Sequence, residues 1–225
     1  MSQGANYTVI QAPSDYGLEV QRGNIAGITF TNKFGRNTAT TTGDAIWAAS
    51  AAYVEPATAE FCNVTSTSVQ DDFGGGTGAG KITITGINDS FDIVTEVVEL
   101  NGMANVLTVN KYWNIHRAYV STKAPSGTDA GAVGTISIIS TAAGTPAMGS
   151  LAIGYNQTQS TIYMVPRNYT AYINIPEVTM QSTTANLTMD IGLFKKDFGG
   201  VFRIQNDFLL VGANDSLQVK SLGHH

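Results

Sequence analysis

The chain has 225 residues and a mass of 23.7 kDa, which accommodates one domain or two small ones and excludes a large multidomain enzyme. Hydrophobic residues make up 43% of it and the mean hydropathy is +0.01, so the chain is not intrinsically disordered. The net charge is −5 and the pI is about 5.0, which argues against nucleic acid as a partner because phosphate binding needs a basic face. The single cysteine excludes an internal disulfide and a thiolate metal cluster.

The composition predicts an all-β protein. Charged residues make up only 13%, about half the share of a typical globular domain. Thr, Ser and Asn occupy the polar positions instead, and there are 24 glycines, a mixture that favours strands and turns over helices. The sequence contains no run of 18 apolar residues, so we expect no membrane-spanning segment, and its start lacks the basic and apolar regions of a signal peptide.

Residues 1–32 are predicted to form an extended N-terminal arm, because Pro13 and frequent glycines interrupt every periodic pattern. We expect this arm to bury its apolar side chains only on assembly, against the surface of another protein. These side chains are Tyr7, Val9, Ile10, Leu18, Val20, Ile25, Ile28 and Phe30. A helix of one or two turns is predicted only for Asp44–Val54, where Asp44 caps an alanine-rich run that Pro56 ends, and an extended linker at Ala48–Ala52 is the alternative.

From about residue 58 the pattern is that of β-strands. Apolar and polar residues alternate along Lys81–Thr85, Thr135–Ile138 and Asn186–Leu193, the period of a half-buried strand. Further strands are predicted at Phe91–Leu100, Val106–Val109, Tyr112–Ser121, Thr161–Val165, Thr170–Ile175, Val201–Leu210 and Leu217–Leu222. Short strands separated by turn residues are typical of an antiparallel β-sandwich or jelly roll, which we place at residues 33–175. Pro176 cannot donate to a strand ladder, so residues 176–225 are predicted as a C-terminal β layer.

The run Gly75–Lys81 matches the G-x-x-x-x-G-K part of a phosphate-binding loop. Ile82 stands where Ser or Thr would bind magnesium, and the residues after Lys81 alternate as a strand instead of forming the helix that such a loop needs. We therefore interpret the run as a glycine-rich connection between strands.

Other candidates for chemistry are weak. Cys62 and His116 would form a catalytic pair only if the fold brought them together, and we interpret both as sheet residues. The adjacent Asp71 and Asp72 are interpreted as solvated turn residues, although they are also candidate acids for a small hydrolase and candidate ion ligands. The aspartates Asp89 and Asp92 flank a turn, and the aromatic side chains Trp47 and Trp113 are candidate sugar-stacking groups. We predict no catalytic residue, no cofactor and no metal site.

A stronger signal comes from several short motifs in a fixed order. They are Asn32–Asn37, Thr42–Trp47, Tyr53, Pro56, Gly76–Ala79, Ile84–Ile87, Thr95–Gly102, Ile115–Val120, Gly127–Gly131, Gly154–Thr158, Tyr163–Pro166 and Ala171–Ile173. Over residues 32–175 this order resembles a family of virion structural proteins of tailed bacteriophages, and Gly199–Arg203 resembles the C-terminal continuation of that family.

The resemblance implies a β-rich virion component without enzymatic activity. The expected role is a capsid cement or decoration protein on the outside of the shell, made in the host cytoplasm. The expected partners are the major capsid protein and neighbouring copies of the same chain, as a homotrimer, with no nucleic acid and no membrane. A tail, baseplate or fibre component and a glycan-binding adhesin module are the alternatives.

Overall fold

The computed structural model describes residues 16–38, 41, 43–49, 51–128, 131–173, 177–180, 187–212 and 217–220. Within these residues the regular secondary structure is almost entirely β-strand, with one short helix. The chain divides into two compact units, residues 1–169 and residues 170–225, whereas the sequence-based boundary lay between residues 175 and 176. Among the described residues, no helix is both long enough and apolar enough to cross a bilayer.

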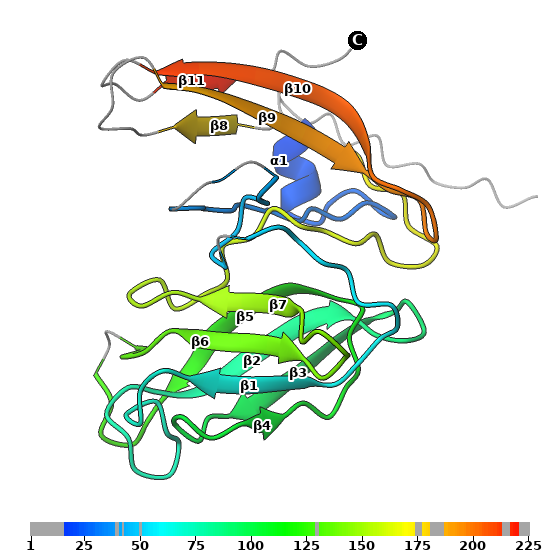
Figure 1. Cartoon of the computed structure of the whole chain (residues 1–225). Coiled ribbons are helices and arrows are strands. Elements are labelled where there is room, and N and C mark those ends of the chain that lie inside the picture. Colours follow the sequence, from blue (N-terminus) through cyan, green and yellow to red (C-terminus); the bar gives the residue numbers. More distant parts are fainter. Residues whose placement is uncertain are drawn as a thin grey trace, which may run out of the picture. The chain divides into compact units, whose positions relative to one another are not determined.

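The first unit contains a β-sandwich of two antiparallel sheets (Figure 1). One sheet has the strand order β4 (Val106–Leu107), β1 (Cys62–Ser66), β6 (Ile136–Ser140) and β7 (Ala147–Leu151). The other has the order β3 (Ile93–Glu99), β2 (Ala79–Ile87) and β5 (Asn114–Lys123). The predicted all-β antiparallel sandwich is therefore confirmed.

The sandwich core forms because alternate residues of the strands point inward. In β1 and in β6 every second side chain is buried, which is the period of two that the sequence shows. The inward side chains of both sheets form one apolar cluster, and burial of such side chains is the main favourable contribution to folding. This cluster includes Cys62, Val64, Ile82, Ile84, Val98, Leu100, Tyr112, Ile115, Ile136, Ile138, Met148 and Leu151.

The predicted helix at Asp44–Val54 is wrong. The described residues of this segment contain no helix, and Trp47 instead forms a β-bridge with Ser160 while Ala48 N donates to Gln159 O at 2.9 Å. Backbone groups that pair with a distant segment are no longer available for a helical ladder, so tertiary pairing overrides the helix propensity of alanine. The helix that the structure contains is α1 (Tyr16–Gln21), inside the predicted extended arm.

Two of the predicted strands are also wrong or only partly described. Residues 161–165 are not in a strand, because Thr161 N donates to Ile46 O and no regular ladder follows. Residues 170–173 are not in a strand either, and residues 174–176 lie outside the described residues.

The described residues of the second unit contain two antiparallel strand pairs. Strand β9 (Leu187–Lys195) pairs with β10 (Arg203–Gly212), with a bulge between Ile204 and Asn206, and β8 (Glu177–Met180) pairs with β11 (Leu217–Lys220). The alternation predicted along β9 is present in part: Met189 and Ile191 are half-buried and Asp190 is exposed.

Candidate functional site

Asp71 is the most completely buried charged side chain among the described residues, and the interpretation of it as a solvated turn residue is wrong. Its exposed fraction is 0%. Its Oδ1 accepts hydrogen bonds from Ala79 N and Val133 N, each at 2.9 Å, and its Oδ2 accepts from Ser66 Oγ at 2.6 Å and Gly134 N at 2.8 Å. A buried carboxylate needs such donors to replace water. Asp71 therefore joins the end of β1, the start of β2 and the segment before β6.

The glycine-rich run forms a tight turn around this carboxylate and has no phosphate-binding geometry. A methyl group on Gly78 would overlap Asp71 Oδ1 and lie 2.9 Å from Val133 Cγ2, so the close approach requires glycine there. Lys81 lies within β2, where its Nζ is 2.6 Å from Glu99 Oε1 and 3.9 Å from the centre of the Phe73 ring. The loop thus encloses a carboxylate of the chain itself.

Asp72 has a different role from its neighbour. It is half-buried, and its Oδ1 accepts a hydrogen bond from Gly74 N at 3.0 Å within the same turn. Of the two aspartates that flank a turn, Asp89 is exposed, and Asp92 Oδ1 lies 3.3 Å from Arg167 Nη2, with both of these side chains exposed. Among the residues that the structure describes, no three His, Cys, Asp or Glu side chains gather as a metal site would require.

His116 lies in β5 at an irregularity of the strand register, where Arg117 pairs with Thr85 but Ile115 pairs with Gly86, and its exposed fraction is 7%. Its Nε2 is 2.7 Å from Met164 O, and its ring stacks on Tyr163 with centroids 4.3 Å apart. Burial is the main cause that lowers the pKa of His116 from 6.5 to about 4; the hydrogen bond to Met164 O opposes it and the nearby Lys33 ammonium acts in the same direction as burial, so the ring is neutral at pH 7.

The segment 33–37 is held against the sandwich close to His116. Lys33 Nζ donates to His116 O at 2.6 Å, and Asn37 Nδ2 donates to Ala45 O at 3.2 Å. Burial lowers the pKa of Lys33 to about 8, and the neighbouring Arg117 contributes in the same direction. The lysine thus stabilises the position where the arm joins the sandwich.

Cys62 and His116 make separate contacts in different sheets. Cys62 is completely buried in β1, and its Sγ is 3.9 Å from Glu60 O. Burial raises the pKa of its thiol to about 12, and Glu96 and Glu60 add to this effect. A nucleophilic cysteine needs a lowered pKa, so this thiol has the environment of a core residue.

A second polar cluster, which is half-buried, surrounds Glu96, and sequence reasoning did not identify it. Its Oε1 accepts from the Tyr112 hydroxyl at 2.8 Å, and its Oε2 accepts from Val109 N at 2.9 Å and Asn110 N at 3.3 Å. Burial raises the pKa of Tyr112, and the hydrogen bond to Glu96 raises it further. The cluster fixes the turn between β4 and β5.

The aromatic side chains proposed for sugar stacking are largely internal. Trp47 is 2% exposed, its Nε1 donates to Ala51 O at 2.7 Å, and its ring packs edge-on against Tyr53. Trp113 is half-buried and stacks on Phe91 with centroids 5.6 Å apart. Trp47 therefore presents no free face to a glycan.

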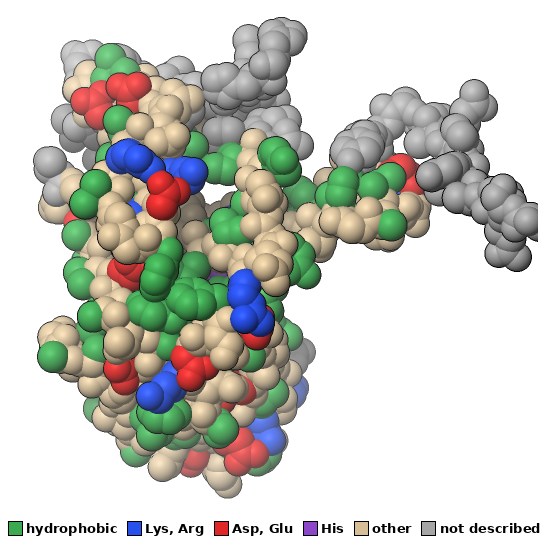
Figure 2. Space-filling view, turned by 90° about the vertical axis from the view of Figure 1, so that its right-hand side faces the viewer, with side chains coloured by type: hydrophobic (Ala, Val, Ile, Leu, Met, Phe, Trp, Pro, Cys, Tyr) green, Lys and Arg blue, Asp and Glu red, His purple; other side chains and the backbone are tan. Residues whose placement is uncertain are grey.

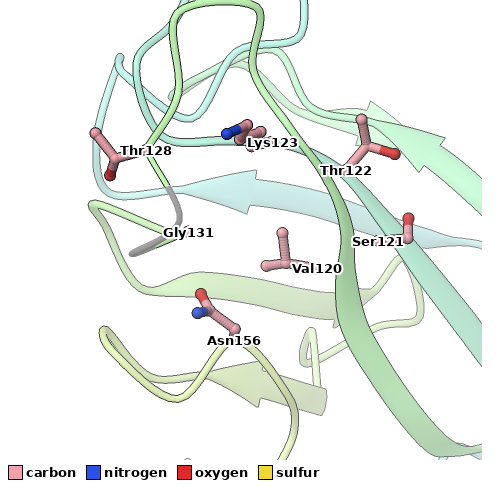
Figure 3. Close-up of a pocket in the computed structure, with 7 residues that line it drawn as sticks. All are labelled: Val120, Ser121, Thr122, Lys123, Thr128, Gly131 and Asn156. Carbon is pink, nitrogen blue, oxygen red and sulfur yellow. The ribbon is translucent and has the colours of Figure 1, made fainter.

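A shallow hollow of about 220 Å³ lies beside β5 (Figure 3). Its lining residues are Val120, Ser121, Thr122, Lys123, Thr128, Gly131 and Asn156. Asn156 Oδ1 already accepts a hydrogen bond from Ala132 N at 2.9 Å, and Asn156 O accepts from Val120 N at 2.8 Å. Typical small-molecule sites enclose roughly 300–1,000 Å³, so this hollow is smaller than they are.

Exposed apolar side chains are the more prominent surface feature, and Figure 2 shows them among scattered charged groups on one side of the chain. Of the predicted capsid-contacting residues, Leu18, Ile28 and Phe30 are 40%, 45% and 48% exposed. Ile25 is half-buried, and Val20, at 9% exposed, is already buried in the single chain. Tyr7, Val9 and Ile10 lie outside the described residues.

The second unit exposes an even larger apolar surface, which sequence reasoning did not single out. None of its side chains that the structure describes is buried. Its exposed large side chains, with their exposed fractions, are Tyr172 (89%), Ile173 (65%), Phe194 (57%), Phe198 (70%), Val201 (75%), Phe202 (52%), Ile204 (56%) and Leu209 (62%).

No protein-family model, no curated protein and no solved structure matches this chain.

Proposed function

We propose that this protein is a structural component of a tailed-bacteriophage particle, specifically a cement or decoration protein on the outer face of the capsid. The observation that carries the proposal is the exposed apolar surface of the arm and of the second unit. Exposed large apolar side chains in such number are typical of a surface that binds other macromolecules. The ordered sequence motifs resemble those of virion structural proteins, and this resemblance is the reason to place the binding on a bacteriophage particle.

The second unit gives the strongest support. The strands that the structure describes in this unit form two-stranded pairs, and isolated two-stranded pairs are marginally stable in water unless another surface covers them. Phe194, Phe198 and Phe202 lie on or beside the longest pair and are more than half exposed. Burial of one such ring contributes about 1.5–3 kcal/mol. We propose that the major capsid protein and neighbouring copies, arranged as a homotrimer, cover these rings.

The buried polar groups are consistent with a structural role. Asp71, Glu96 and His116 each contact backbone groups that hold loops or segments of the sandwich in place. Such contacts contribute to rigidity, and a cement protein needs rigidity because it must keep many weak contacts aligned over a symmetric shell.

The arm contact is tested by co-sedimentation of full-length protein with particles that lack it. Ile28→Asp with Phe30→Asp should lower particle occupancy at least about tenfold, because burying two unpaired carboxylates costs more than the roughly 1.4 kcal/mol that a factor of ten represents. The matched control is Thr29→Asp with Thr31→Asp, which adds the same charge to the same segment and should retain occupancy. Unchanged occupancy after deletion of residues 1–30 would contradict the arm contact.

The place on the particle is tested by copy number and by labelling. Immunogold labelling of intact particles should decorate the head, and the chain should be present in a copy number close to that of the major shell protein. Labelling confined to the tail, with about a dozen copies, would replace the cement proposal with the tail or baseplate alternative.

A further inference from the structure

The two sheets of the sandwich differ in charge. The segments 61–70, 100–110 and 130–166 contain no Asp, Glu, Lys, Arg or His, and all 12 basic and 17 acidic residues of the chain lie elsewhere. These three segments build β1, β4, β6 and β7, which together form the four-stranded sheet. The strands of the other sheet carry charged groups, such as Lys81, Glu99 and Arg117.

The outward side chains of the four-stranded sheet form a neutral face, built by β1, β4, β6 and β7 of the layer that lies nearer to the viewer in Figure 1. Its members are Asn63, Thr65, Leu107, Ser137, Ile139, Ala147 and Ser150. They point outward because their neighbours in β1, β6 and β7 point into the core. In the strand register, Ser137 lies between Thr65 and Ser150, and Asn63 lies between Leu107 and Ile139.

Exposed apolar side chains lie in the loops directly before or after the strands of this sheet. They are Val69 (62% exposed), Met103 (62%), Val109 (84%), Val133 (48%) and Ile153 (55%). The neutral face carries no charged side chain and is flanked by exposed apolar ones. It therefore differs from a solvent-facing surface, which normally carries about 25–35% charged residues of both signs. Depletion of charge is instead the property of interface centres, because an unpaired charge is expensive to bury.

We propose that the neutral face is the surface through which a second copy of this chain binds. The chain has a net charge of −5, so two copies repel each other unless they meet where no formal charge is present. A two-fold contact of this face with the same face of another copy, separate from the contacts within the proposed homotrimer, brings like groups together, and a charged group there would oppose its own equivalent. Hydroxyl and amide side chains avoid this conflict, because each of them both donates and accepts hydrogen bonds.

This inference is independent of the place of the protein on a particle, because it concerns only contacts between copies. Sedimentation velocity and native mass spectrometry of the full-length protein should show an oligomer. Ser137→Lys and Ser137→Asp should each weaken association at least about tenfold, since each places a charge at the centre of the contact. An equimolar mixture of the two variants should recover mixed oligomers, because opposite charges then face each other.

The matched controls place the same charges on the opposite sheet. Val97 is 58% exposed on β3, so Val97→Lys and Val97→Asp should leave association unchanged. Circular dichroism and the thermal midpoint confirm that each variant is folded. A monomeric wild-type protein, an unchanged mass for both Ser137 variants, failure of their mixture to recombine, or equal dissociation by the Val97 variants would overturn the proposal.

Discussion

The Asp71 contacts predict a large stability loss for a single substitution. Asp71→Ala leaves four buried donors without their acceptor, one hydroxyl and three backbone N–H groups. Each unsatisfied buried donor costs about 1–3 kcal/mol, so even the low end gives a loss of about 4 kcal/mol. The total free energy of unfolding of a domain is roughly 5–15 kcal/mol. The variant should therefore unfold at a much lower denaturant concentration than the wild-type protein.

The assay is urea unfolding followed by circular dichroism and by fluorescence of Trp47 and Trp113. Asp71→Asn should lose about 2 kcal/mol, because an amide keeps one acceptor oxygen but turns an NH₂ group toward the Gly134 N–H. Asp72→Asn is the control and should change stability by less than about 0.5 kcal/mol, since its oxygen still accepts from Gly74 N. The reasoning is refuted if Asp71→Ala unfolds at the same urea concentration as Asp72→Asn.

Three further predictions concern the same unit. Because the pKa of His116 is about 4 when folded and 6.5 when unfolded, the free energy of unfolding should fall by about 3 kcal/mol as pH drops from 6.5 to 4, and His116→Gln should remove this dependence in pH-resolved denaturation curves. Gly78→Ala should lower the thermal midpoint by the equivalent of about 1–3 kcal/mol through overlap with Asp71, whereas Gly75→Ala, where a methyl group meets open space, should leave it nearly unchanged. Tyr112→Phe removes the donor to Glu96 Oε1 and should cost about 1–2 kcal/mol in urea titrations, and an unaltered midpoint would contradict the role assigned to this bond.

Strand positions could be predicted well where alternation is local. The run Lys81–Thr85 lies inside β2 and Thr135–Ile138 overlaps β6, because inward and outward side chains follow each other at every second residue regardless of which strand pairs with which. The helix prediction for Asp44–Val54 was wrong because the structure of this segment depends on long-range pairing. Alanine favours a helix locally, but Trp47 and Ala48 pair with residues more than a hundred positions later, which no local pattern reveals.

The sequence also predicts one part of the two candidate binding surfaces, the arm and the neutral face, and leaves another part to the structure. The apolar residues of the arm and the absence of charge from residues 130–166 are visible in the sequence. That three uncharged segments become neighbours in one sheet is known only from the strand pairing, which joins Val64 of β1 to Val106 of β4 and Ile138 of β6.

The sequence by itself determined that this chain forms paired strands with few charges, because composition and a two-residue period act within a few neighbouring positions. The tertiary structure alone decided that Asp71 is buried while Asp72 is not. Two of the donors to Asp71, Val133 N and Gly134 N, come from 62 and 63 residues further along the chain. A carboxylate is stable in the interior only where such distant donors converge, and this convergence depends on how the whole sandwich closes.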